Sequence, residues 1–133
     1  MKYALDTNII SYIMRGEGGV KERWIKEESL GNFSTIPLIV YYEVKRGLLA
    51  VNATTKLNAF EKVCASLQID DLNPQDMDIA ARIYAERTKQ GRPIDDADLL
   101  IAAQAISRDC TLVTNNTKHF EGIEGLSLEN WVL

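Results

Sequence analysis

The spacing of hydrophobic residues changes several times along the chain, and each change predicts a new strand or helix. Short apolar runs bounded by turn or cap residues predict strands. Apolar residues three or four positions apart, with charged residues between them, predict helices with one buried face. Strands are expected at residues 2–6, 33–36, 67–72, 111–114 and 126–128. Helices are expected at residues 9–14, 20–30, 37–49, 54–66, 74–90 and 94–107.

Two prolines mark the start of helices. Asn73-Pro74-Gln75-Asp76 supplies an N-cap residue, a proline whose missing N–H would be unpaired anyway, and an acid that can bond back to the cap. Pro37 suits the first turn of the helix at 37–49 for the same reason. Because strands alternate with helices, we expect an α/β fold in which helices cover both faces of a mostly parallel sheet of four to five strands.

Composition narrows the class of protein. A chain of 133 residues, 46% hydrophobic and 26% charged, is expected to form a single domain over residues 1–133. The formal net charge of −4 argues against a broad basic surface that coats nucleic acid. Asp6 interrupts the apolar stretch that a signal peptide needs, and no long apolar run follows, so we expect a cytoplasmic protein that does not span a membrane.

Three acids occupy positions where the pattern calls for apolar residues. Glu43 lies four residues after Ile39 and so shares the stripe of its helix that should face the sheet. Asp98 precedes Ile101 by three residues and lies on the apolar stripe of the helix at 94–107. Asp6 closes the first strand, at the carboxyl end where open parallel sheets bind their ligands.

Carboxylates in this arrangement favour a hard divalent cation. Burying one unpaired carboxylate costs several kcal/mol, and three in one crevice repel one another unless a cation is present. Mg²⁺ and Mn²⁺ prefer carboxylate and water oxygens and can activate water for phosphodiester hydrolysis. We therefore predict that Asp6, Glu43 and Asp98 are both the catalytic residues and the ligands of Mg²⁺ or Mn²⁺.

Each acid also has an ordinary structural interpretation. Asp6 can cap the helix that follows it, and Glu43 can turn toward solvent if the buried face of its helix is misjudged. Asp95-Asp96-Ala97-Asp98 resembles a capping box with Asp95 at the N-cap and Asp98 at the third helical position. Asp95 and Asp96 are interpreted mainly as cap and helix-dipole partners.

Several short motifs occur in a characteristic order. They are Leu5-Asp6-Thr7-Asn8, Glu43, Gly91-Arg92-Pro93-Ile94, Asp98-Leu99-Leu100-Ile101-Ala102-Ala103, Val113-Thr114-Asn115-Asn116 and His119-Phe120. This ordered set, which spans nearly the whole chain, resembles the PIN-domain ribonucleases and specifically the VapC-type toxins of toxin–antitoxin pairs. The resemblance implies a three-layer α/β/α sandwich, Mg²⁺- or Mn²⁺-dependent cleavage of RNA, a homodimer, and inhibition by a small antitoxin.

The resemblance also implies roles for individual residues. Asp6, Glu43 and Asp98 correspond to the acidic triad of the family. Many members carry a fourth acid where this chain has Asn116, an amide that can bind a metal or orient water but brings no charge. Thr7 resembles a hydroxyl that supports the site and is equally well explained as a helix-start residue.

Other residues have weaker functional interpretations. Thr114 can support the site as Thr7 does, although an ordinary strand residue is the favoured interpretation. The single histidine, His119, is interpreted as structural. An antitoxin segment is expected to bind a groove around Ile9, Ile13 and Trp24. The basic candidates for contacts to RNA phosphate are Lys45, Arg46, Arg82, Arg92 and Lys118.

Two other classes of protein compete with the ribonuclease. A phosphorylated receiver domain needs adjacent acids after its first strand, and here Asp6 is followed by Thr7 and Asn8. A catalytically weak PIN domain that acts as a binding module in operon regulation is the second alternative. Asn116 in place of a fourth acid keeps that second interpretation open.

Overall fold

Five parallel strands form the centre of the molecule. The computed structural model describes all 133 residues, and its sheet has the strand order β3-β2-β1-β4-β5. The strands are β1 (Lys2–Leu5), β2 (Phe33–Pro37), β3 (Gln68–Asp70), β4 (Thr111–Val113) and β5 (Ser127–Glu129). Ala4 of β1 pairs with Thr35 on one side and with Leu112 on the other, so β1 is the central strand.

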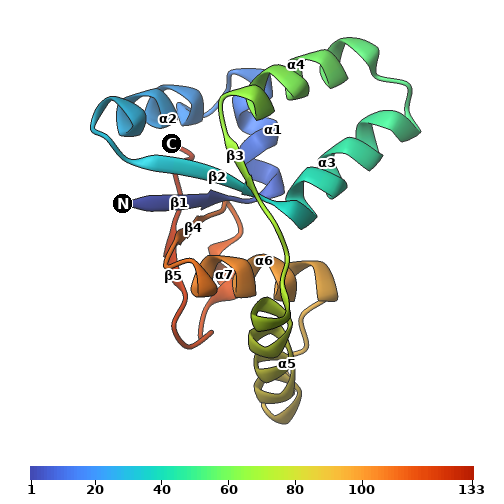
Figure 1. Cartoon of the computed structure of the whole chain (residues 1–133), viewed down its shortest axis with the longest axis vertical. Helices are drawn as coiled ribbons and strands as arrows, with labels where there is room; N and C mark the ends of the chain where they lie inside the picture. The colour runs from blue at the N-terminus through green and yellow to red at the C-terminus, as the bar shows by residue number, and fades with distance from the viewer.

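Helices cover both faces of this sheet. They are α1 (Thr7–Arg15), α2 (Val20–Ser29), α3 (Leu38–Ala50), α4 (Thr54–Ala65), α5 (Pro74–Lys89), α6 (Asp96–Ser107) and α7 (Thr117–Phe120). Figure 1 shows α1 to α4 on one side of the sheet and α5 to α7 on the other. The predicted α/β/α sandwich with a parallel sheet is therefore confirmed.

The direction of winding reverses at the central strand. From β1 the chain adds β2 and β3 on one side, and it then returns to add β4 and β5 on the other. Open α/β sheets bind their ligands outside the carboxyl ends of the strands at such a reversal. In this sheet the reversal lies between β1 and β4, which end immediately before Asp6 and Thr114.

Some element boundaries differ from those expected. Pro37 has an extended backbone (φ −58°, ψ 142°) and closes β2 instead of lying in the first helical turn. The helix expected from residue 94 begins at Asp96, because Asp95 takes an extended N-cap conformation. The short helix α7 was missed, since four residues are too few to show a helical period. The capping box of Asn73 and Asp76 is present as predicted.

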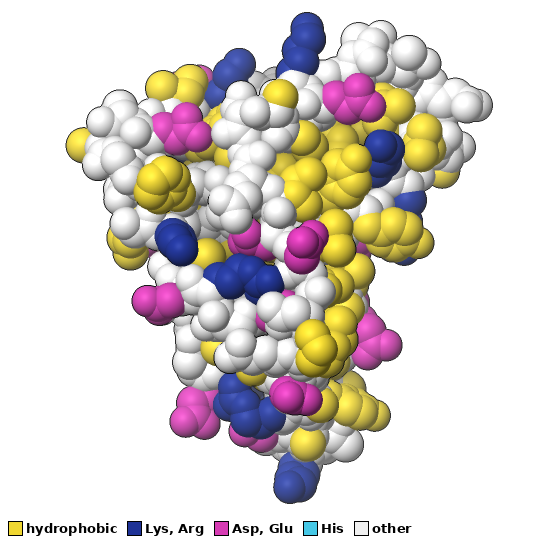
Figure 2. Space-filling model, in the orientation of Figure 1, with side chains coloured by type: hydrophobic (Ala, Val, Ile, Leu, Met, Phe, Trp, Pro, Cys, Tyr) yellow, Lys and Arg dark blue, Asp and Glu magenta, His cyan; other side chains and the backbone are white.

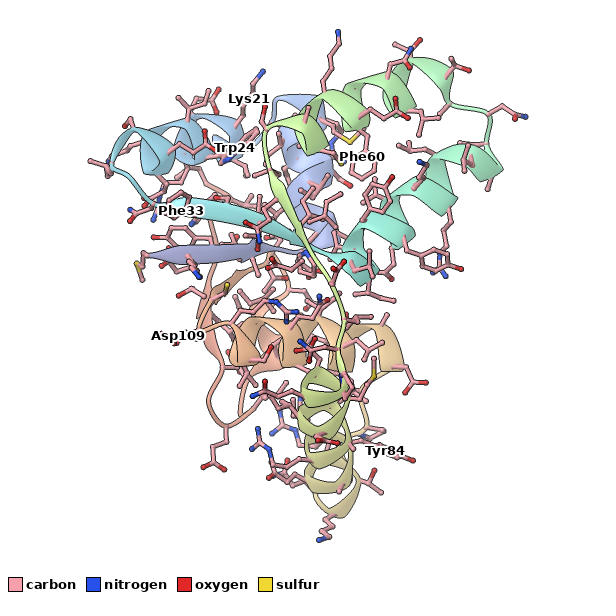
Figure 3. The ribbon with its side chains drawn as sticks, viewed as in Figure 1. Lys21, Trp24, Phe33, Phe60, Tyr84 and Asp109 are labelled. Carbon is pink, nitrogen blue, oxygen red and sulfur yellow. The ribbon has the colours of Figure 1, made fainter.

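One hydrophobic core runs through the sheet and both helical layers. Ile9 and Ile13 of α1 are buried in it, and Trp24 of α2 points inward as Figure 3 shows. The expected antitoxin groove around these three residues is therefore wrong, because their side chains pack inside the molecule. Phe60 of α4 packs on Tyr41 of α3, with ring centroids 5.7 Å apart. No helix combines the length and hydrophobicity that a membrane crossing requires.

Candidate active site

Asp6 lies between the end of β1 and the start of α1, with only 5% of its surface exposed. One carboxylate oxygen accepts the backbone N–H of Thr7 at 2.8 Å. The other accepts the hydroxyl of Thr114 at 2.8 Å and the side-chain amide of Asn8 at 3.2 Å. Burial raises the pKa of Asp6, and these hydrogen bonds oppose the rise. Asp6 therefore caps α1 and also presents a buried carboxylate at the reversal of the sheet.

Thr114 connects this carboxylate to the strand beside β1. Its side chain is fully buried, and its oxygen also accepts the backbone N–H of Asn116 at 3.0 Å. The interpretation of Thr114 as an ordinary strand residue is wrong, because its hydroxyl holds Asp6. The order of the strands would have revealed this contact, since β4 lies beside β1.

Glu43 lies in the second turn of α3 and faces the same region. The hydroxyl of Thr7 donates to its Oε1 at 3.0 Å. Its other oxygen lies 3.9 Å from the guanidinium of Arg46, one helical turn later. The side chain is 22% exposed, so the alternative in which Glu43 turns fully into solvent is excluded. Thr7 supports the site, because it contacts Asp6 through its backbone and Glu43 through its hydroxyl.

Asp98 lies in the first turn of α6. Its backbone N–H donates to the carboxylate of Asp95 at 2.9 Å, so Asp95 is the N-cap. The carboxylate of Asp98 does not complete the capping box; it contacts Nε2 of His119 at 2.7 Å. The pKa of Asp98 is raised to about 6, chiefly by burial and then by the charges of Asp95 and Asp6, while His119 opposes the rise.

His119, not Asn116, occupies the position beside Asp98. Asn116 is exposed, and its only hydrogen bond toward the site comes from its backbone N–H to Thr114. His119 extends from α7, and one ligand atom each of Asp95, Asp98 and His119 lies within 4.8 Å of the others. The sequence alone did not reveal this position, because the direction of the His119 side chain depends on the unpredicted helix α7.

The donor set fits a hard divalent cation. Thr7 contacts both Asp6 and Glu43, and the charge of Asp6 acts on Asp98 strongly enough to raise its pKa. The carboxylates of Asp6, Glu43 and Asp98 thus lie near the carboxyl end of the central strand, on segments distant in the sequence. A divalent cation is the simplest partner that offsets their repulsion, and carboxylate oxygens are the ligands that Mg²⁺ and Mn²⁺ favour.

Comparison with known proteins decides the family. A family model described as the PIN domain matches residues 3–126. The tRNA(fMet)-specific endonuclease VapC of Shigella flexneri is 31% identical over 134 residues, with 98% of each chain covered. The ribonuclease VapC2 of Rickettsia felis is 33% identical over 135 residues, again with 98% of each chain covered. The chain belongs to the VapC ribonucleases of the PIN-domain family.

Solved structures agree with the membership in the VapC family. The crystal structure of VapBC2 from Rickettsia felis bound to a DNA fragment from their promoter matches with a TM-score of 0.91 at 30% identity. The match covers 98% of this chain and 99% of that chain. The resemblance inferred from the ordered motifs is confirmed, as is the class of enzyme, a ribonuclease of the toxin–antitoxin type. The receiver-domain interpretation is excluded. VapC ribonucleases, like other PIN-domain nucleases, generally depend on divalent metal ions.

The burial of Asp98 beside other negative charges predicts how one substitution changes stability. The folded pKa of about 6 lies above the ordinary value of 3.8, so the folded state binds this proton more tightly than the unfolded state. The resulting stabilisation is complete below the ordinary value and is lost as the pH rises through 6. Asp98→Asn keeps the neutral form at every pH. In chelator, its melting temperature relative to wild type should therefore rise between about pH 4 and pH 6 and then level off.

Asp96→Asn is the matched control, because Asp96 is an exposed neighbour in the same helical turn. Its melting temperature relative to wild type should show no such rise over this pH range. Melting curves at constant ionic strength measure both differences. A pH-independent effect of Asp98→Asn would mean that neither burial nor neighbouring charge disfavours the ionised form of Asp98 in the folded protein.

Proposed function

We propose that Asp6, Glu43 and Asp98 hold a divalent cation, Mg²⁺ or Mn²⁺, with which this ribonuclease hydrolyses RNA phosphodiester bonds. The observation that carries the proposal is the convergence of three carboxylates at the reversal of the sheet. Two of them have raised pKa values caused chiefly by burial. Groups that are costly to hold together are expected at functional sites, and here the cost is removed by a bound cation.

The residues around the triad orient it. When bound, the cation lowers the pKa of a coordinated water and offsets the negative charge of the phosphate. Thr114 and the backbone of Thr7 fix both oxygens of Asp6, so its carboxylate cannot rotate. The hydroxyl of Thr7 fixes Glu43 in the same way. Asn116, the fourth predicted site residue, stays a prediction, with its backbone supporting Thr114.

Transfer RNA is the substrate that we propose. The VapC proteins of Shigella flexneri and Salmonella typhimurium are both named tRNA(fMet)-specific endonucleases. Beside Glu43, the guanidinium of Arg46 lies over the ring of Tyr42, 5.0 Å from its centroid, and Tyr42 is exposed. A cation and an exposed aromatic ring at this position provide a phosphate contact and a surface for base stacking, although the chain is acidic overall.

Cleavage of purified transfer RNA tests this proposal. Asp6→Asn, Glu43→Gln and Asp98→Asn should each lower the cleavage rate about a hundredfold or more, because each removes a charge that acts on the reacting phosphate through the cation. Asp95→Asn should stay within a few-fold of wild type, because asparagine also caps helices. Chelator should abolish cleavage and Mn²⁺ should restore it. Sequencing of the RNA ends identifies the bond that is cut.

Three results would contradict the proposal: cleavage that survives chelation, equal losses for Asp95→Asn and Asp98→Asn, and activity retained by Asp6→Asn. If wild type cuts no RNA with either ion, the alternative of a catalytically weak binding module takes its place. Expression in a bacterial host gives a second readout. Wild type should arrest growth, and Asp6→Asn at an equal protein level should not.

An apolar groove beside the triad is the proposed binding site of an antitoxin. A cavity of about 330 Å³ lies between α1, α3 and α4, and Figure 2 shows hydrophobic side chains gathered there. Met14, Val44 and Leu48 line its wall, and Thr7 and Glu43 lie at its edge. An apolar antitoxin segment that carries an arginine fits this arrangement, because a guanidinium pairs with carboxylates through two parallel hydrogen bonds.

Gly47 offers a way to fill this groove without disturbing the fold. It lines the cavity, lies inside α3, and a Cβ atom added to it would meet nothing within 4 Å. Gly47→Leu should therefore fold at least as stably as wild type, since glycine weakens a helix interior by about 1 kcal/mol. It should still cut RNA, but the affinity for the antitoxin encoded by the adjacent reading frame should fall at least tenfold.

Asn58→Leu on the exposed face of α4 is the control and should bind the antitoxin normally. Calorimetry of toxin with antitoxin measures both affinities. If Gly47→Leu binds the antitoxin as tightly as wild type does, the antitoxin binds another surface.

A second apolar face supports the proposal of a homodimer. Met77 and Tyr84 of α5 are exposed, and Figure 3 shows Tyr84 pointing away from the molecule. With Leu100 of α6 they border a hollow of about 300 Å³. A second copy of the chain on this face would cover it and bring two sites close together, since Asp96, two residues before Asp98, also lines the hollow. We further propose that residues 1–133 act as one domain in the cytoplasm, as the continuous core and the function suggest.

A further inference from the structure

His119 places a ring nitrogen against the carboxylate of Asp98 in the candidate site. Its Nε2 lies 2.7 Å from an oxygen of Asp98, and the charge of His119 also acts on Asp6. The imidazole is 37% exposed, so one side of it stays open to solvent and substrate. His119 is also the single histidine of the chain, which makes any histidine signal unambiguous.

The backbone that carries His119 is fixed from several directions. The carbonyl oxygen of His119 accepts a hydrogen bond of 2.8 Å from Arg87, a buried guanidinium on α5. The backbone N–H of His119 donates to the carbonyl of Asn116 at 3.1 Å. Phe120, the next residue, is buried in the core. An ion pair on the surface does not require a fixed backbone. A side chain that binds a ligand does, because its atoms must be held at the position of the ligand.

The spacing of His119 and Asp98 matches that of two ligands on one ion. Ligands at right angles on an octahedral ion, each about 2.1 Å from it, lie about 3.0 Å apart. The observed 2.7 Å differs from this by a few tenths of an ångström, so a small side-chain rotation suffices. We propose that His119 is a nitrogen ligand of the cation that Asp6, Glu43 and Asp98 hold. This inference rests on the metal site proposed above.

The chemistry of this ligand predicts metal selectivity. Carboxylates suit Mg²⁺ and Mn²⁺ alike, whereas imidazole favours transition ions, whose affinities rise in the order Mn²⁺, Co²⁺, Ni²⁺. A site with one imidazole and three carboxylates therefore prefers Mn²⁺ to Mg²⁺. Many family members carry a fourth acid in addition to the triad. In this chain the neutral nitrogen of His119, and not the amide of Asn116, takes the place of that acid as a ligand.

Pulsed electron paramagnetic resonance of bound Mn²⁺ tests the proposal directly. The full chain, without an affinity tag that contains histidine, is loaded with less than one equivalent of Mn²⁺ in a buffer free of nitrogen. Wild type should show electron-spin-echo modulation from a directly bonded ¹⁴N, and ¹⁵N-histidine labelling should convert it to the ¹⁵N pattern. His119→Gln should lose the modulation, whereas Asn116→Ala should keep it.

Calorimetric titration gives the second readout. His119→Gln should lower the ratio of Mn²⁺ to Mg²⁺ affinity about tenfold or more, and His119→Glu should raise the affinity for Mg²⁺. If Mn²⁺ binding requires Asp98 but shows no histidine nitrogen, His119 is only an ion-pair partner and the inference is overturned while the acidic site stands. If Asp6→Asn and Asp98→Asn bind Mn²⁺ as wild type does, the proposed metal site fails and this inference fails with it.

Discussion

The hydrogen bond from Thr114 to the buried carboxylate of Asp6 joins two neighbouring strands at the candidate site. Asp6 is 5% exposed and its charge acts on Asp98, so its oxygens need close donors. Thr114, the first residue after β4, supplies one of them at 2.8 Å. The same hydroxyl accepts the N–H of Asn116, and α7 follows directly with His119. One threonine thus donates to the most buried acid of the candidate site and also holds the start of the loop that carries His119.

Much of this arrangement was predictable, because it follows from the spacing of hydrophobic residues and from the places of the acids along the predicted helices and strands. The alternation of strands and helices predicted the layered fold, and acids on otherwise apolar stripes predicted Glu43 and Asp98. Contacts between segments distant in the sequence were not predictable in this way. Thr114 reaches Asp6 across 108 positions, and His119 reaches Asp98 from a helix of four residues. The prediction of a groove around Ile9, Ile13 and Trp24 was wrong, because the sequence does not reveal whether an apolar stripe faces the core or a partner protein.

The site and the proposed antitoxin groove share two residues, Thr7 and Glu43. Thr7 also contacts Asp6, so an occupant of the groove would lie beside two of the three acids that we propose hold the cation. An arginine that pairs with Glu43 competes with the cation for the same oxygen atoms, because a guanidinium and a metal ion need the same lone pairs. On the proposed binding mode, inhibition by an antitoxin would require no conformational change elsewhere in the protein.

Anomalous X-ray diffraction from crystals grown with Mn²⁺ tests the central claim, which is that one cation is held jointly by Asp6 at the end of β1, Glu43 of α3 and Asp98 of α6. Data collected at the manganese absorption edge locate the ion without any assumption about its ligands. The account predicts a peak within about 2.3 Å of carboxylate oxygens of Asp6 and Asp98, with Glu43 bound directly or through a water. A peak only at other surface acids, or none in crystals that contain ample Mn²⁺, would contradict it.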